Sequence, residues 1–389
     1  MSEQNKCNFD EVIIRKNTGC AKYDATLEVF GKADLNPLWV ADMDFKTPDF
    51  ILEDLNKAIK HGIFGYPKQT PQIFEAICAW QKEKNNLDIK AENLSLSIGV
   101  LASLSAAIEA FSDVGDEVIV QSPVYYPFYS IIKANKRVLV KNPLQKDENN
   151  FYTIDYEDLK KRITPKTKIL VLCSPHNPVG RIWSKEELTK LGNICLENNI
   201  KIISDEIHSD LVFSSFTPFS SISKEFAQNS LSLQAPSKTF NLAGLCASYV
   251  ISHNLELKKA FDITMKKREA THVNSLGLVS MQSAYENGSA WLEQLLSYLK
   301  QNINFVQDFL EKNTKIKFLA PQATYLLWLD FSAYEQSHKE LKDILINKCN
   351  LALNDGITFG AEGNKFFRLN CALSKNKLEL ALKDLAKFI

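Results

Sequence analysis

One stretch of the chain reads SLSLQAPSKTFNLAGL (residues 230–245) and combines an apolar run with a lysine at its end. Residues 230–236 predict a buried strand, which proline and serine then terminate. Lys238 follows at the rim of this buried region, where an ammonium group is costly to desolvate. The lysine therefore either extends its amine into water or keeps it at the strand end for chemistry.

Four other short apolar runs predict further buried strands, and helical patterns lie between them. These runs are residues 117–121, 167–173, 200–205 and 247–252. The segment 184–199 begins with Ser184 and has Glu187 three positions later, which predicts a helix with a capping box. The alternation predicts an α/β fold with a mostly parallel sheet between helices, and such sheets bind ligands beyond the carboxyl ends of their strands.

The last hundred residues have a different pattern. A long helical stretch at about 285–312 leads into the apolar segment 323–331, and a further helix, the strand 366–370 and a final helix follow. This order predicts a smaller α+β domain. Because the first 45 residues lack enough apolar core to fold alone, we expect a small domain of residues 1–45 and 286–389. Residues 46–285 then form the large domain.

Composition and charge argue against several functional classes. Lys+Arg and Asp+Glu both number 46, so no global field exists to hold nucleic acid or an anionic membrane. The eight cysteines form no CxxC pair and no histidine cluster stands beside them, so we expect neither a metal site nor disulfides. The polar N-terminus is unlike a signal peptide, and no apolar stretch is long enough to span a bilayer. Free thiols suit the cytoplasm.

Polar side chains follow three of the predicted strands. Asn177 comes after the strand 167–173, Asp205 ends the next strand, and Lys238 follows the third. Each alone has a structural alternative, namely a turn, a helix cap or a surface charge. Their joint occurrence at successive strand ends predicts that they meet at one edge of the sheet.

With these residues in place, the sequence resembles the fold-type I pyridoxal-phosphate enzymes of the class I/II aminotransferase superfamily. More narrowly, it resembles the MalY/PatB group of cystathionine and cysteine-S-conjugate β-lyases. The resemblance implies a seven-stranded sheet in the large domain and a homodimer whose active sites lie at the subunit interface. It covers nearly the whole chain, through residues 37–48, 61–67, 122–128, 174–183, 204–213, 235–245, 323–331 and 367–370.

The resemblance assigns the catalytic roles. Lys238 matches the lysine that bonds pyridoxal phosphate and later takes the Cα proton, as a desolvated amine of lowered pKa can do. Asp205 matches the carboxylate that keeps the pyridine nitrogen protonated. Asn177 matches the donor to the phenolate oxygen and also lies near the substrate. Tyr125 matches the aromatic residue that stacks on the cofactor ring.

The same resemblance implies a phosphate site at the start of a helix, where free N–H groups favour an anion. Its backbone part is formed by Gly99, Val100 and Leu101, and the hydroxyl of Ser237 adds a contact. Tyr66 matches a tyrosine that reaches the phosphate from the other subunit of the dimer.

Substrate binding is implied at three further positions. Arg368 matches the arginine that holds the α-carboxylate, for which a guanidinium fork is suited. Ala41 is expected to lend a backbone contact to the same carboxylate. Tyr126 is expected to face the substrate side chain, although core packing is a serious alternative for this residue.

Two positions depart from the aminotransferase pattern. His208, which we still expect to contact the cofactor, stands where many aminotransferases have tyrosine. Cys246 stands where many have an arginine that grips the phosphate. Both departures resemble the lyase group. Tyr23 stands where that group commonly has tryptophan, a difference that we expect not to affect function.

The implied reaction is α,β-elimination from an L-amino acid with sulfur at Cβ. L-Cystathionine would give homocysteine, pyruvate and ammonia, which places the reaction in sulfur amino-acid metabolism and methionine biosynthesis. An aminotransferase is the first alternative, because both reactions begin with removal of the Cα proton. The second is a lyase that also modulates transcription by direct protein contact, as some members of the group do.

Overall fold

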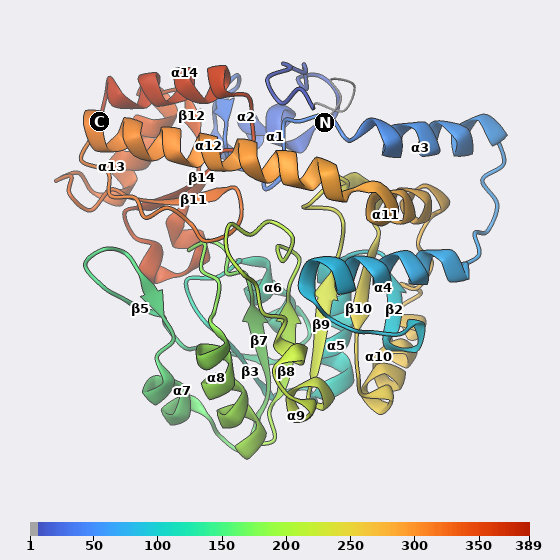
Figure 1. Ribbon diagram of the computed structural model, residues 1–389. Helices are drawn as coiled ribbons and strands as arrows, with labels where there is room; N and C mark the ends of the chain where they lie inside the picture. The colour runs from blue at the N-terminus through green and yellow to red at the C-terminus, as the bar shows by residue number, and fades with distance from the viewer. Residues whose placement is uncertain (1–6) are drawn as a thin grey trace.

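The computed structural model describes residues 7–389, and a seven-stranded sheet lies at its centre (Figure 1). The strands follow the order β2-β10-β9-β8-β7-β3-β4. Strand β10 runs antiparallel to both its neighbours, and the other pairs are parallel. Their bounds are β2 Leu94–Ser97, β3 Glu117–Val120, β4 Val138–Lys141, β7 Thr167–Cys173, β8 Lys201–Asp205, β9 Ser230–Gln234 and β10 Ser248–Ile251. The mostly parallel α/β sheet is thus confirmed.

The five strands expected from apolar runs are all present, whereas β2 and β4 were not predicted. Strand β2 reads LSLS, so its serines interrupt the apolar run that would reveal it. Strand β4 lies at the edge of the sheet and is only partly buried. Both strands are therefore identified by their hydrogen bonds to neighbouring strands, and their composition does not predict them.

Successive residues of each central strand point to opposite faces of the sheet, where helices cover them. Ile169 and Val171 pack with α5, α6 and α10, while Leu170 and Leu172 pack with α7, α8 and α9 on the other side. The bounds are α5 Val100–Phe111, α6 Pro127–Ala134, α7 Tyr156–Arg162, α8 Lys185–Glu197, α9 Lys224–Gln228 and α10 Leu255–Lys267. The capping box expected at Ser184 is confirmed, because its hydroxyl accepts from Glu187 N–H and the Glu187 carboxylate accepts from Ser184 N–H.

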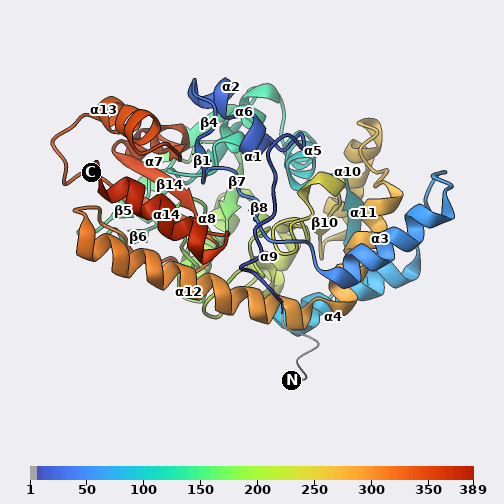
Figure 2. The same cartoon turned by 90° about the horizontal axis from the view of Figure 1, so that it is seen from above.

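The C-terminal part contains a three-stranded sheet of order β11-β14-β13. The long helix α12 crosses above the central sheet, and α14 lies beside it in both views (Figures 1 and 2). The expected helix at about 285–312 is divided at Gly288, which packs against the ring of Phe240. The bounds are α11 Ser275–Asn287, α12 Ser289–Asn313, β11 Leu326–Asp330, α13 His338–Asp343, a π-helix Ile344–Lys348, β12 Leu351–Ala352, β13 Asn354–Asp355, β14 Phe366–Asn370 and α14 Lys375–Ala386.

The N-terminal residues pack against this C-terminal part. Strand β1 pairs in parallel with β12, more than 300 residues along the chain. Helices α3 and α4 instead pack against α11 and extend to one side (Figure 1). The domain boundaries at residues 45/46 and 285/286 stay a prediction. The bounds are α1 Ala21–Asp24, α2 Thr26–Phe30, β1 Asn36–Pro37, α3 Asp49–His61 and α4 Pro71–Asn85.

The remaining short elements lie in connections. They are β5 Gln145–Lys146, β6 Tyr152–Thr153 and the 3₁₀ turns Ala91–Asn93, Phe219–Ser221, Ala243–Leu245, Gly356–Phe359 and Ala361–Gly363. Among the helices that the structure describes, none has the length and apolar character needed to cross a bilayer.

Gly356 lies where two backbone segments meet beside β14. A Cβ atom there would lie 2.2 Å from the carbonyl oxygen of Phe366 and 2.3 Å from that of Gly363. Because backbone atoms cannot rotate away, we expect Gly356→Ala to lower the free energy of unfolding by about 1–3 kcal/mol in thermal or denaturant melts. The control is Gly244→Ala, whose Cβ would meet no atom within 4 Å. Equal melting midpoints for both variants would contradict the prediction.

Candidate active site

A cavity of about 360 Å³ lies at the carboxyl ends of β7, β8 and β9, beside the start of α5. It brings together ten of the residues expected from the sequence. They are Ala41, Gly99, Val100, Leu101, Tyr125, Asn177, Asp205, His208, Ser237 and Lys238. The rest of its wall is mostly small or apolar and consists of Ile98, Ala102, Cys173, Ile207, Ala235, Ala243, Cys246 and Ala247.

The amine of Lys238 is turned into this cavity rather than into bulk water. Its Nζ donates a hydrogen bond of 2.7 Å to the carbonyl oxygen of Ala41. Burial, and then the charge of Arg368, lower the pKa of Lys238 to about 8, although Asp42 and Asp205 act in the opposite direction. A substantial fraction of the amine is therefore neutral, and nucleophilic, just above neutral pH.

Asp205 ends β8 and is buried beside Cys173, its partner in the strand register. The Oδ1 atom of Asp205 accepts a hydrogen bond of 3.2 Å from the N–H of Ile207. Burial raises the pKa of Asp205 to about 6, against the effects of that N–H and of Lys238. A carboxylate in this environment favours a cationic or N–H-bearing partner from the cavity.

Arg368, on β14 in the C-terminal part of the chain, is buried and contacts the cavity through Asn177 rather than lining it directly. Its Nη1 donates to Asn177 Oδ1 at 3.0 Å, and its Nη2 donates to Trp39 O at 2.8 Å and to Asn354 Oδ1. Its Nε is buried without a hydrogen-bond partner among the described residues. Because Asn177 uses its carbonyl oxygen for Arg368, its amide nitrogen is left to donate to a ligand.

Helix α5 starts at the cavity wall without a side-chain cap. Its N-cap, Gly99, has φ +156°, a conformation that favours glycine, and a Cβ there would meet no atom within 4 Å. The first N–H groups of a helix have no partner within it, so those of Val100 and Leu101 are suited to an anion. Ser237 lines the same cavity.

His208 is buried in the cavity wall, and its Nδ1 has no hydrogen-bond partner in the part of the chain that the structure describes. Burial, and then the charges of Lys238 and Arg368, lower the pKa of His208 to about 3. The imidazole is therefore neutral at physiological pH, and it adds a polar group to the cavity without adding charge.

The tyrosines expected at the site divide into three positions. Tyr125 lines the cavity, and its ring centre lies 5.5 Å from that of Tyr126. Tyr126 lies outside the cavity, between the rings of Tyr125 and Phe359. Its ring centre lies 5.6 Å from that of Phe359. Tyr66 lies between α3 and α4, fully exposed, and the single chain does not bring it to the cavity.

Several supporting residues were not predicted from the sequence. Tyr325 donates to Ala41 O at 3.1 Å, so this carbonyl accepts from both Tyr325 and Lys238. The expected backbone contact of Ala41 to the substrate carboxylate stays a prediction. Asn354 and Trp39 hold Arg368. Trp39 and Tyr325 lie in motifs that the sequence analysis named. Their partners, Arg368 and Ala41, lie far away in the sequence and can be identified only from the folded structure.

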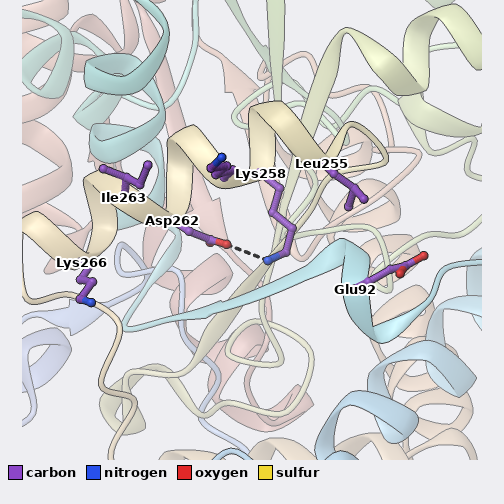
Figure 3. Close-up of a pocket in the computed structure, with 7 residues that line it drawn as sticks. Glu92, Leu255, Lys258, Asp262, Ile263 and Lys266 are labelled. Atoms are coloured by element: carbon purple, nitrogen blue, oxygen red, sulfur yellow. Dashed lines mark hydrogen bonds and ion pairs between the residues drawn. The ribbon is translucent and has the colours of Figure 1, made fainter.

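A second hollow lies on the surface along α10 (Figure 3). In this hollow, Lys258 Nζ lies 2.7 Å from Asp262 Oδ2, and Asp262 Oδ1 also accepts a hydrogen bond from the hydroxyl of Ser95. Lys266 lies toward the other end of the helix, away from the pair of Lys258 and Asp262 (Figure 3). We assign no function to this hollow.

The family described as aminotransferase class I and II matches residues 35–385. The cystathionine beta-lyase PatB of Bacillus subtilis (strain 168) is 40% identical over 97% of this chain and 98% of its own length. Cystalysin from Treponema denticola, whose crystal structure contains pyridoxal 5'-phosphate, superposes with a TM-score of 0.95 at 33% identity, covering 98% of both chains. The PLP-bound C-S lyase from Staphylococcus hominis superposes with a TM-score of 0.91 at 30% identity, covering 98% of both chains.

The lowered pKa of Lys238 can be measured in protein freed of any pyridoxal phosphate. We expect its reductive methylation by formaldehyde and borohydride, mapped by mass spectrometry, to reach half its maximal rate near pH 8. The lysine of a model peptide, methylated in the same way, should require a pH of about 10.4. A common midpoint for Lys238 and the peptide would show that the amine of Lys238 is not desolvated.

Proposed function

The chain belongs to the aminotransferase class I and II family, and from this premise we propose that it is a pyridoxal-phosphate-dependent carbon–sulfur β-lyase. It would act on L-cystathionine and other cysteine S-conjugates and release a thiol, pyruvate and ammonia. The observation that carries the proposal is one cavity lined by Lys238, Asp205 and Asn177, in which Asn177 also accepts a hydrogen bond from the guanidinium of Arg368. The identity to a cystathionine beta-lyase over nearly the whole chain supports the same reaction.

The residues of the cavity fit pyridoxal phosphate. The uncapped start of α5 and the open space at Gly99 suit a phosphate group, to which Ser237 can also donate. The partly desolvated amine of Lys238 suits an aldehyde, and the buried carboxylate of Asp205 suits a protonated pyridine nitrogen. The side wall offers the ring of Tyr125, and Asn177 offers its amide N–H groups.

When bound, pyridoxal phosphate supplies the electron sink that stabilises negative charge at Cα. The amine of Lys238, once free, takes the Cα proton as general base. The carboxylate of Asp205 keeps the proton on the pyridine nitrogen. Elimination then breaks the Cβ–S bond, the sulfur leaves as a thiolate, and the remaining enamine hydrolyses to pyruvate and ammonia.

Arg368 orients the substrate for this proton transfer. Its guanidinium is already fixed by Asn177, Asn354 and the carbonyl of Trp39, so little freedom is lost when a carboxylate binds. Burial lowers the pKa of Arg368 to about 10, and the group stays charged at neutral pH. A buried cation of this kind gains from an anionic partner.

One residue of the wall resembles the lyase group rather than the aminotransferase pattern. Cys246 occupies the position where the aminotransferase pattern has a phosphate-gripping arginine, and it lines the cavity. Without that arginine, this chain offers the phosphate the start of α5 and Ser237, and a further donor would strengthen the site. We propose that this donor is Tyr66 of a second subunit, because Tyr66 is fully exposed and carries exposed apolar neighbours, Ile63 and Phe64.

A cytoplasmic location is part of the proposal. All eight cysteines are free thiols, including several that are buried. Such usage is typical of a reducing compartment.

The first test is pyruvate release from L-cystathionine by the purified protein with pyridoxal phosphate and no keto acid. We expect sustained turnover with equal amounts of thiol, because elimination needs no second substrate. Lys238→Ala should abolish turnover, since it removes both the cofactor attachment and the general base. Activity that appears only when 2-oxoglutarate is added would identify an aminotransferase instead.

The role of Tyr66 predicts a change in cofactor retention. Tyr66→Phe removes one hydrogen bond to a charged group, worth about 1.5–3 kcal/mol, so we expect the Kd for pyridoxal phosphate to rise by at least about tenfold. Fluorescence titration of the cofactor-free dimer measures this change. Tyr334→Phe is the control, because Tyr334 lies in the C-terminal part, away from the cavity wall. An unchanged Kd would reject the assignment across the interface.

A further inference from the structure

The backbone from Trp39 to Phe45 has an unusual set of hydrogen bonds, in which side chains rather than strands satisfy successive carbonyls. The donors come from distant parts of the chain. They are Arg368 to Trp39 O, Asn370 to Val40 O and Asp42 O, Lys238 and Tyr325 to Ala41 O, and Arg15 and Asn241 to Met43 O. Both the amine and the guanidinium of the candidate site are thus attached to this one segment, which we call the 39–45 segment.

The N-terminal residues grip the acidic side chains of the 39–45 segment. Lys22 Nζ lies 3.0 Å from Asp44 Oδ1, and Arg15 Nη1 lies 2.7 Å from the same atom. Arg15 Nη2 also pairs with Asp42 Oδ2. The hydroxyl of Tyr23 donates to Asp44 Oδ2. We call these three donors, Arg15, Lys22 and Tyr23, the N-terminal clamp.

The Lys22–Asp44 pair at the centre of the clamp is buried to a degree that surface ion pairs do not reach. The side chain of Lys22 is 0% exposed and that of Asp44 is 4% exposed. Burial alone would raise the pKa of Asp44, but Lys22, Tyr23 and Arg15 together hold it below its usual value. Buried charges persist only when their partners are well placed, so each donor constrains the position of the 39–45 segment.

We propose that Arg15, Lys22 and Tyr23 are positioning residues that act through Asp42 and Asp44 to hold the Ala41 carbonyl against the amine of Lys238. Ala41 immediately precedes Asp42, and its carbonyl lies 2.7 Å from Lys238 Nζ. This carbonyl is an acceptor for the amine whenever the amine is free. The proposal rests on the β-lyase mechanism only for its catalytic consequence, because the position of the amine can be measured without catalysis.

Tyr23 gives the proposal its most specific residue. From the sequence, the replacement of a common tryptophan by Tyr23 was expected not to affect function. In the structure the hydroxyl of Tyr23 is one of the three donors to Asp44. The indole of tryptophan also carries an N–H donor, so tyrosine and tryptophan can both donate a hydrogen bond. Phenylalanine lacks it, while keeping the ring and most of the volume.

The first measurement is the pH midpoint of Lys238 methylation in cofactor-free protein. The charged groups that act on Lys238 are Asp42, Asp205 and Arg368. The titratable groups around it are His208, Tyr125, Cys173 and Cys246 in the cavity wall, and Tyr325, which shares the Ala41 carbonyl. A carbonyl acceptor and the carboxylate of Asp42 both favour the ammonium form. If the clamp loosens, both move away, and we expect Lys22→Met to lower the midpoint by about one pH unit. Tyr23→Phe should shift it in the same direction by less.

The second measurement is steady-state kinetics of the holoenzyme. The clamp holds Asp42 and Asp44, next to Ala41, whereas Arg368 meets the segment only at Trp39 and is also held by Asn177 and Asn354. Tyr23→Phe should therefore lower kcat by about tenfold and change KM by much less. Tyr23→Trp should restore both kcat and the methylation midpoint, since it returns a donor to Asp44. Lys16→Ala is the matched control, because Lys16 lies in the same segment but pairs with the exposed Asp34.

The outcomes separate the clamp from a purely structural role and from the β-lyase proposal. Should Lys22→Met fail to fold, Tyr23→Phe still decides the question. A lower melting temperature in Tyr23→Phe, with the midpoint and kcat unchanged, would overturn the positioning role. A shifted midpoint in a protein without any lyase activity would support the clamp and reject the proposed reaction.

Discussion

The structure depends on one constraint, which is that the amine of Lys238 must be kept inside the protein without a carboxylate in direct contact. A direct ion pair would hold the amine as ammonium, and complete isolation would make its burial too costly. The carbonyl of Ala41 instead accepts a hydrogen bond from the amine, and the more distant carboxylates of Asp42 and Asp205 raise its pKa. For the Ala41 carbonyl to accept from this amine, the backbone around Ala41 must be fixed. The side-chain hydrogen bonds to the 39–45 segment fix it.

The central sheet provides the other half of the geometry. Strands β7, β8 and β9 are neighbours and parallel, so the residues that follow them emerge at the same edge. Asn177, Asp205 and Lys238 therefore meet although about 30 residues separate each from the next. The helices that intervene cover both faces of the sheet, which leaves the strand ends as the place where polar groups can approach a ligand.

Much of this arrangement can be predicted from the sequence, because it depends on local patterns. Continuous apolar runs reveal the central strands, and Ser184 with Glu187 reveals the start of α8. The contacts that complete the site cannot be predicted in this way. Asn354 meets Arg368 through strand pairing, and Tyr325 meets Ala41 across nearly 300 residues. Tyr66 has no partner within the chain's own cavity, so a single chain gives no sign of what it contacts.

Arg368 lies where the two ends of the chain fold against each other. Its guanidinium is held by Trp39 from the N-terminal part, by Asn177 from the sheet and by Asn354 from its own β-structure. All three acceptors are needed to orient the guanidinium, since this planar group needs hydrogen-bond acceptors on more than one side. A carboxylate that binds Arg368 thus contacts a group that both ends and the sheet hold together. Binding at this point is coupled to the 39–45 segment, and through Ala41 to the amine of Lys238.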